Sequence, residues 1–389
     1  MTDRGKGWPS TAILVAISGK DPEGLDASLK ELSLLLENLG TGTAGQMIQR
    51  RDKPDPDSFI GSGKAQEIAL LARESGASLL VVDGRLSPAQ AAHLSEITGL
   101  MIWDRPLVIM KIFEQRAQTG EAKLQIELAR CRYEIPLLKG LGMQMSRLGG
   151  GLGTRGPGET EFERHRRKLE RREREISRKI EIIRERRQAQ RKRRVRAGLR
   201  TVALAGYTNS GKSSLLKCLS GDKSLVSEDR LFSTLDPFVR RVRLPGGSFI
   251  LMTDTVGFIR NLPHDLVTAF RATMEEVSGS DLVLLVADAS FGGFNDDISV
   301  VETLLQSIGA EEIPRMVVMN KIDLLEPEEA SSRIAEVGRT QDIVIPVSAT
   351  RGDNIGTLLE NIEKFFGYVT GKGLDEDAQK HDWFQQDQY

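Results

Sequence analysis

The chain contains little cysteine and little histidine, and it has no long apolar run. Its two cysteines, Cys131 and Cys218, cannot build a disulfide framework or a four-cysteine metal site. Its four histidines lie too far apart in the sequence to form a local pair of metal ligands. No segment approaches the roughly 20 apolar residues that cross a bilayer. These absences predict a protein of the reducing cytoplasm, with no histidine-bound metal and no insertion into a membrane.

Aromatic residues are also scarce, at 5%, but the composition is that of a folded protein. Of the 389 residues, 39% are hydrophobic and 28% are charged. These fractions exclude a wholly disordered or collagen-like chain. At about 150 residues per domain, the length predicts two to three domains.

The net charge of −1 hides an uneven distribution. Residues 161–196 contain 17 Lys or Arg and 7 Asp or Glu, a balance of +10, whereas the remainder of the chain carries −11. A basic segment joined to an acidic remainder favours a polyanionic partner, with nucleic acid first among the candidates. The alternative is a solvated, arginine-rich helix without a partner.

Residues 1–105 alternate apolar runs with helical patterns. Strands are expected over residues 12–17, 45–49, 79–83 and 100–104. The segments between them have helical periodicity, most clearly residues 25–39, where six leucines share one face. This βαβ rhythm predicts a small open α/β domain with a parallel sheet.

Residues 106–198 carry two heptad patterns instead. Apolar residues recur every seven positions at Met110, Ala117, Leu124 and Cys131, and again at Phe162, Leu169, Ile176 and Ile183. Two helices with such seams can pack against each other. The region is therefore predicted to be a long antiparallel helical hairpin.

The tip of this hairpin is expected at residues 140–158, which include eight glycines. A loop of this length is either functional or a flexible linker. Glycine lets backbone N–H groups approach a phosphate or a base, and Arg147 and Arg155 add positive charge. We expect these two arginines to contact RNA, and a plain linker is the alternative.

Residues 199–367 return to a βα rhythm. Strands are expected over residues 201–205, 239–244, 249–253, 282–287, 315–319 and 343–346. Residues 368–389 are polar and acidic and are expected to form a disordered tail. The predicted third domain is thus α/β, and its motifs make it a Ras-like P-loop fold.

The first of these motifs is Gly206–Ser213, which matches G-x-x-x-x-G-K-[ST] between an apolar strand and a helix. Its glycines let the loop wrap phosphates, and its N–H groups and the helix N-terminus attract negative charge. Lys212 is expected to reach the β- and γ-phosphates, and Ser213 to ligate Mg²⁺. The motif therefore predicts a nucleoside triphosphate site.

Three further segments specify the nucleotide. Asp254–Gly257 ends a strand, which places a carboxylate to hold Mg²⁺ through water and a glycine N–H to meet the γ-phosphate. Asp323, in Asn320–Asp323, can accept hydrogen bonds from N1–H and the exocyclic amine of guanine, a donor pair that adenine lacks. Ser348 and Ala349 fit the backbone site for the guanine O6. The expected nucleotide-binding residues are Gly206, Tyr207, Thr208, Asn209, Ser210, Gly211, Lys212, Ser213, Ser214, Asp254, Thr255, Val256, Gly257, Asn320, Lys321, Asp323, Ser348 and Ala349.

The catalytic residues are expected to be Lys212, Gly257 and Thr234. Thr234 lies in the polar segment before Asp254 and is expected to close on Mg²⁺ and the γ-phosphate. Phe258 follows Gly257 where many GTPases have a Gln that orients water, and a phenyl ring cannot do this. Intrinsic hydrolysis is therefore expected to be slow and to need a partner, unless another residue takes over. Asn209 raises the possibility of a bound K⁺.

With these motifs in place, the sequence resembles the HflX family of ribosome-associated GTPases from Thr11 to Phe366. The resemblance rests on GYTNSGKSS at 206–214, LFSTLDP at 231–237, DTVGFI at 254–259 and NKID at 320–323. The glycine-rich segment 149–160 resembles a loop of that family. Ser210, Ser214 and the pair Phe238-Val239 depart from residues that are common in it.

The resemblance implies a cytoplasmic GTPase that binds the large (50S) ribosomal subunit and rRNA. It also implies that the protein splits stalled or vacant 70S ribosomes under stress, and that the ribosome stimulates hydrolysis. We expect a monomer away from the ribosome. The alternative is a GTP-gated rRNA-binding or assembly factor that does not separate subunits, because both functions need the same charge and the same switch.

Overall fold

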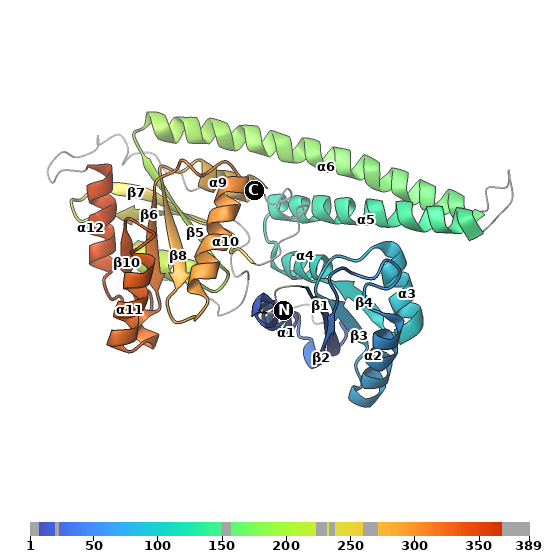
Figure 1. Ribbon diagram of the computed structural model, residues 1–389. Helices are drawn as coiled ribbons and strands as arrows, with labels where there is room; N and C mark the ends of the chain where they lie inside the picture. Colours follow the sequence, from blue (N-terminus) through green and yellow to red (C-terminus); the bar gives the residue numbers. More distant parts are fainter. Residues whose placement is uncertain are drawn as a thin grey trace. The chain divides into compact units, whose positions relative to one another are not determined.

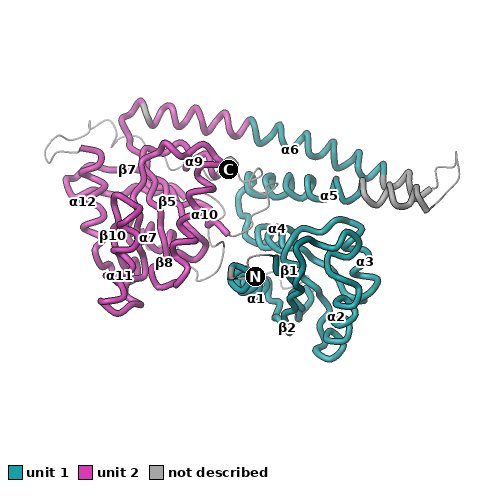
Figure 2. The backbone as a smooth tube through the Cα atoms, viewed as in Figure 1, with its two compact units in different colours: residues 1–181, 260–269 teal, residues 182–259, 270–389 magenta. Residues whose placement is uncertain are grey.

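The computed structural model describes residues 8–19, 23–148, 157–222, 232, 238–259 and 271–367. The chain divides into two compact units, residues 1–181 with 260–269 and residues 182–259 with 270–389 (Figure 2). This division falls inside helix α6 (Pro157–Arg196). The finer boundaries at 105/106 and 198/199 stay predictions, and the expected tail at 368–389 lies outside the described residues.

The first unit contains a four-stranded sheet in which every neighbouring pair is parallel, as predicted (Figure 1). The strand order is β2-β1-β3-β4. The two central strands are buried on both faces, which is why they read as continuous apolar runs. The elements are β1 (Thr11–Ser18), α1 (Glu23–Asn38), β2 (Gly42–Arg50), α2 (Ser62–Ser75), β3 (Leu79–Val82), α3 (Pro88–Thr98), β4 (Met101–Asp104) and α4 (Arg105–Arg116).

Charged side chains at the carboxyl edge of this sheet form a network of ion pairs and hydrogen bonds. Arg105 is 1% exposed and is paired with Glu31 and, at 2.9 Å, with Asp83. Asp104 accepts hydrogen bonds from the N–H groups of Leu86 and Leu107 and caps helix α4. Burial raises the pKa of Asp104. Each charge here is matched by a neighbour within the unit, which makes its burial tolerable.

The predicted hairpin is present as α5 (Gly120–Leu148) and α6 (Figure 1). Within the first unit the two helices enclose an apolar cluster, and ion pairs flank it. Arg172 binds Glu127 at 2.6 Å, and Arg132 binds Glu173 at 3.1 Å. The cluster consists of Leu128, Cys131, Ile135 and Ile176, with Leu124, Leu169 and Ile180 packed against it.

The start of the hairpin differs from the prediction. The heptad pattern predicts one continuous helix from Met110 to Cys131, but α4 ends at Arg116 and Ala117 is extended (ψ 112°). The Thr119 hydroxyl accepts a hydrogen bond from the N–H of Ala122 at 3.1 Å. Such a cap, next to Gly120, favours a new helix start over continuation. Met110 is accordingly buried outside the hairpin cluster.

The predicted glycine-rich loop is also shorter than expected at both ends. Residues 140–148 continue α5, and Pro157 and Gly158 begin α6. Each glycine costs a helix about 1 kcal/mol relative to alanine. The leucines, methionines and glutamine among residues 141–148 are good helix formers that offset this cost. Residues 149–156 lie outside the described part of the chain.

The second unit has a six-stranded sheet in the order β10-β9-β8-β5-β7-β6. All pairs are parallel except β6 with β7, which is antiparallel. The elements are β5 (Arg200–Gly206), α7 (Lys212–Ser220), β6 (Phe238–Arg243), β7 (Phe249–Asp254), α9 (Arg271–Ser278), β8 (Leu282–Asp288), α10 (Phe294–Ser307), β9 (Arg315–Asn320), the 3₁₀ turn η1 (Ile322–Leu324), α11 (Pro327–Val337), β10 (Val344–Pro346) and α12 (Ile355–Phe366). This arrangement confirms the predicted P-loop GTPase fold.

The core of the second unit is built from the apolar runs of the central strands. Val202 and Leu204 on β5, Leu284 on β8 and Val318 on β9 are fully buried in one cluster. Packing these runs in parallel brings the carboxyl ends of β5, β7, β8 and β9 to one edge of the sheet, where open α/β sheets bind ligands. Among the described helices, none is long and apolar enough to cross a membrane.

Candidate nucleotide-binding site

The loop between β5 and α7 requires glycine at two positions. A Cβ at Gly206 would lie 2.2 Å from the carbonyl oxygen of Val286. Gly211 has φ +91°, and a Cβ there would lie 2.2 Å from Nδ2 of Asn320. Asn209 also adopts a left-handed conformation (φ 62°). The backbone of this loop is thus held tightly against β8 and β9, in a shape that a larger residue would break.

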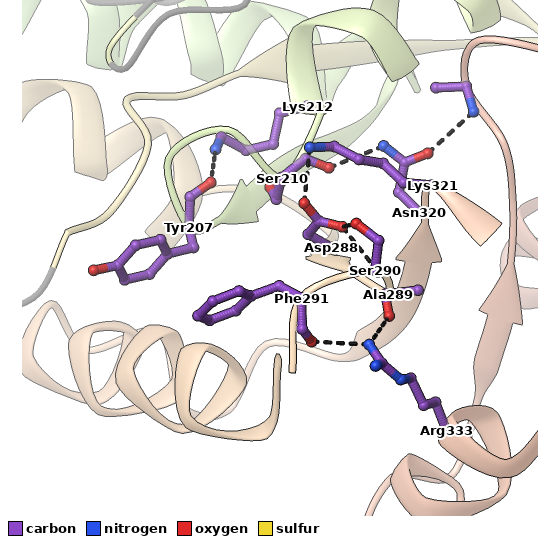
Figure 3. A network of polar contacts seen from close by, with 11 residues as sticks. Tyr207, Ser210, Lys212, Asp288, Ala289, Ser290, Phe291, Asn320, Lys321 and Arg333 are labelled. Carbon is purple, nitrogen blue, oxygen red and sulfur yellow. Dashed lines mark hydrogen bonds and ion pairs between the residues drawn. The ribbon is translucent and has the colours of Figure 1, made fainter. Parts of the chain in front are cut away.

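Lys212 is buried inside the loop. Its Nζ donates hydrogen bonds to the carbonyl oxygens of Gly206 at 3.0 Å and Tyr207 at 2.7 Å (Figure 3). Burial lowers the pKa of Lys212 to about 8, and the nearby Asp254 carboxylate opposes this shift. The ammonium group therefore sits in the cradle of the loop, where phosphate oxygens can replace the two carbonyls.

Two buried hydroxyl groups in the same loop have no hydrogen-bond partner among the described residues, namely those of Thr208 and Ser210. Buried polar groups are nearly always paired, so these two hydroxyls are available to hydrogen-bond a ligand in the loop. Helix α7 begins at Lys212 and adds the N–H groups of its first turn, where Ser213 and Ser214 are half-buried. Together these groups fit a bound phosphate chain.

A carboxylate and a hydroxyl meet beside the loop. The Ser213 hydroxyl donates a hydrogen bond to Oδ2 of Asp254 at 2.7 Å. Asp254 is 1% exposed at the end of β7, and the Thr255 hydroxyl donates to the carbonyl of Leu204. Hydroxyl and carboxylate oxygens suit Mg²⁺, so the donor set fits this ion. Thr234, the third expected ligand, lies outside the described residues.

The segment after Asp254 is bound to the loop through its backbone. The N–H of Phe258 donates to Gly206 O at 3.1 Å, and the N–H of Thr208 donates to Phe258 O at 2.7 Å. Val256 is buried, and a Cβ at Gly257 would lie 3.1 Å from Nζ of Lys212. The Phe258 ring is 1% exposed. The ring packs in the core and offers no polar group to water.

The end of β9 joins the phosphate loop to the segment after β10. Nδ2 of Asn320 donates to Ser210 O at 2.9 Å, and its Oδ1 accepts from the N–H of Ala349 at 3.0 Å. Ser348 is fully buried. Asp323 is 12% exposed and lies 3.9 Å from Nε of Arg351. The predicted base-reading residues are therefore brought to one edge together with the phosphate loop.

Three polar residues of this edge were missing from the sequence prediction. Asp288, Ser290 and Arg333 form a network with Lys321 (Figure 3). A signal existed for Asp288, because it ends an apolar strand as Asp254 and Asn320 do. The sequence offered no comparable signal for Arg333, which comes from helix α11.

The expected RNA-contacting arginines are not described as side chains. Arg147 belongs to helix α5, but its side chain and the whole of Arg155 lie outside the described residues. A groove between α5 and α6 does carry basic side chains. It is lined by Arg130, Arg164, His165, Lys168, Arg171 and Arg172, together with Glu127, Glu134 and Glu175.

Three family models match consecutive parts of the chain. The N-terminal region of a GTP-binding GTPase matches residues 26–114, and the middle region of such a GTPase matches residues 116–194. A model described as a 50S ribosome-binding GTPase matches residues 201–321.

Relatives match across nearly the whole chain. The GTPase HflX of Caldanaerobacter subterraneus is 44% identical over 353 residues, which is 91% of this chain and 80% of that protein. The GTPase HflX of Escherichia coli is 41% identical over 359 residues, or 92% and 83%. A crystal structure of the GTP-binding protein SsGBP with GDP has a TM-score of 0.51 at 25% identity, over 92% of this chain and 98% of that one.

Proposed function

Because the chain belongs to the HflX family of GTPases, we propose that it binds the large ribosomal subunit and splits stalled or vacant 70S ribosomes. The protein is a guanine-nucleotide-binding enzyme that hydrolyses GTP. In the proposal, the ribosome stimulates this hydrolysis. We also propose that the protein acts in the cytoplasm, is a monomer away from the ribosome, and serves the response to stress.

One observation carries the proposal: the basic helix leads directly into the phosphate loop. Helix α6 ends at Arg196, and β5, whose last residue is Gly206, begins at Arg200. A helix that can follow rRNA phosphates is thus connected by three residues to the strand that carries the nucleotide loop. The match of residues 201–321 to a 50S ribosome-binding GTPase supports the same target.

The residues of the site divide the chemistry in a way that GTP hydrolysis requires. Lys212 and the N–H groups of α7 would hold the β- and γ-phosphates, and Ser213, Asp254 and Thr234 would hold Mg²⁺, which neutralises phosphate charge. The N–H of Gly257 would meet the γ-phosphate. Asp323 would select guanine through two hydrogen bonds, and Ser348 and Ala349 would meet its O6.

No group at Phe258 can orient the attacking water, because its ring is buried and apolar. The missing contribution would come from a partner, an ion or another residue of the chain. We propose the ribosome as the partner, an effect that can reach about 10⁵-fold in related systems. A K⁺ ion near Asn209 is a further candidate. Comparing the rate of GTP hydrolysis in K⁺ and in Na⁺ buffers would test it.

Light scattering tests the proposed splitting directly. Purified protein is mixed with vacant 70S ribosomes and either GTP or a non-hydrolysable analogue. A GTP-dependent fall in scattering supports splitting, whereas stimulated hydrolysis without that fall supports the GTP-gated RNA binder instead. Arg155→Ala should weaken the fall and leave intrinsic hydrolysis unchanged. Arg315→Ala is the matched arginine control. Arg315 begins β9, at the end of the strand opposite Asn320, and its substitution should change neither the fall in scattering nor intrinsic hydrolysis.

A further inference from the structure

The turn that follows β8 lies beside the base-reading segment. Asp288 ends β8 and pairs in register with Asn320 at the end of β9. Oδ2 of Asp288 lies 2.8 Å from Nζ of Lys321 (Figure 3). This ion pair joins a residue outside the recognised nucleotide motifs to a residue inside one of them.

The Asp288 carboxylate is held in a single orientation. Its Oδ1 accepts hydrogen bonds from the N–H of Ser290 at 2.9 Å and from the Ser290 hydroxyl at 2.6 Å. The carboxylate is therefore ordered before Lys321 binds it. An ion pair with one partner already ordered loses less side-chain entropy than an isolated surface pair.

Arg333 of α11 holds the rest of this turn. Its Nη1 donates to the carbonyl oxygens of Ala289 and, at 3.1 Å, Phe291. The N–H of Ala289 in turn donates to Asn320 O at 2.8 Å. The turn is thus fixed from both sides, by a helix and by the strand that carries the base-reading segment.

Lys321 needs such a support, because its backbone is strained. It has φ +64°, a conformation that costs a non-glycine residue free energy and persists only when its surroundings impose it. This conformation also starts the 3₁₀ turn that carries Asp323. Lys321 and the guanine-reading carboxylate therefore belong to one short turn, and a contact that restrains Lys321 acts directly beside Asp323.

We propose that Asp288 is a positioning residue for guanine nucleotide binding, and that it acts by holding Lys321. Ser290 and Arg333 position Asp288 in turn. Asp288 itself is not assigned a contact with the nucleotide. This inference concerns nucleotide binding alone and does not depend on the ribosome as target.

The test measures binding and release of fluorescently labelled GDP by stopped flow. Asp288→Asn keeps the size of the side chain and removes its charge. We expect GDP dissociation to accelerate about tenfold, with an association rate within about twofold of the parent. Arg333→Met should accelerate dissociation about threefold. Glu329→Gln removes the carboxylate that pairs with Arg333 (2.6 Å) outside the turn and is the matched control, expected to leave both rates unchanged.

The double variant decides whether Asp288 acts through Lys321. If it does, Asp288→Asn combined with Lys321→Met should release GDP no faster than Lys321→Met alone. Melting of the nucleotide-free proteins shows in parallel whether each variant is folded. An unchanged dissociation rate in folded Asp288→Asn overturns the proposal. So does an acceleration that multiplies with that of Lys321→Met, because the two residues would then act independently.

Discussion

The two sheets place charged residues at their carboxyl edges in opposite ways. In the first unit, Arg105 is enclosed by Glu31 and Asp83, and Asp104 accepts two N–H groups and the hydroxyl of Tyr133. In the second unit, Nζ of Lys212 donates to two main-chain carbonyl oxygens, and two buried hydroxyls of the same loop have no hydrogen-bond partner among the described residues.

This difference separates an edge that stabilises the fold from an edge that can bind a ligand. The edge of the first sheet pairs its buried arginine with two carboxylates and so stabilises the fold. The edge of the second sheet has donors arranged around a tight loop, and these donors need a ligand to be satisfied. Both edges are formed by the carboxyl ends of parallel strands, so the loop and its side chains, rather than the sheet, identify the binding site.

Among the substitutions at the second edge, removing the lysine should weaken nucleotide binding most. Lys212→Ala should weaken GDP binding at least about 100-fold, because a charged hydrogen-bond donor to phosphate is lost. The unfolding midpoint of the nucleotide-free protein should not fall, since a buried charge is removed. Isothermal titration with GDP and a thermal melt check both statements. Tight GDP binding by this variant would contradict the assignment of the loop.

Removing the arginine of the first edge should lower the stability of the protein and leave GDP binding unchanged. Arg105→Met leaves Glu31 and Asp83 buried without their partner and should destabilise the first unit by about 3–5 kcal/mol. GDP affinity should stay within about twofold. Urea unfolding followed by tryptophan fluorescence reports this unit, because Trp103 is buried in it. Loss of GDP binding in the folded variant would show that the first edge also serves the nucleotide.

A substitution at Asp323, which is expected to read the base, should change which nucleotide the protein prefers. Asp323→Asn should weaken GDP binding about tenfold or more, because an amide cannot accept from both donors of guanine. A base with a carbonyl in place of the exocyclic amine should bind this variant better than it binds the parent. Competition between GDP and xanthosine diphosphate measures the change. An unaltered preference for GDP would remove Asp323 from the base site.

The smallest expected effect is a dependence of GDP affinity on pH. In the nucleotide-free protein the pKa of Lys212 is lowered to about 8. Phosphate binds the protonated form and raises this pKa, so binding takes up a proton and weakens as the pH rises. Between pH 7 and pH 9 the Kd should rise about tenfold. Lys212→Arg keeps its charge throughout this range and should lose the dependence. If the Kd for GDP changes equally with pH in both proteins, the lowered pKa of Lys212 is contradicted.

Much of the second unit could be predicted, because strand ends and loop glycines are local features of a sequence. The phosphate loop follows an apolar strand that ends at a glycine, and Asp254 and Asn320 each end an apolar strand. The network of Arg105 could not be predicted, since its partners come from α1 and from the residue that follows β3 and are brought together only by folding. The role of Arg333 was missed for the same reason, because α11 meets the turn after β8 only in the folded unit.

The helical region shows the limit of periodicity. The heptad repeat predicted a hairpin, and the apolar cluster around Cys131 and Ile176 confirms its packing. It also predicted a helix through Ala117, where the chain instead breaks before Gly120. The cap by Thr119 starts a new helix despite the heptad repeat, and α4 before it contributes no residue to the hairpin cluster.

The most direct test of the account is GTP hydrolysis by the purified protein, alone and with 50S subunits. A buried Phe258 beside the phosphate loop predicts slow intrinsic hydrolysis that accelerates at least about 100-fold when the subunit is added. Lys212→Ala should remain inactive in both conditions. Fast hydrolysis without the subunit, or a rate that the subunit leaves unchanged, would contradict the claim that a ribosomal partner completes this site.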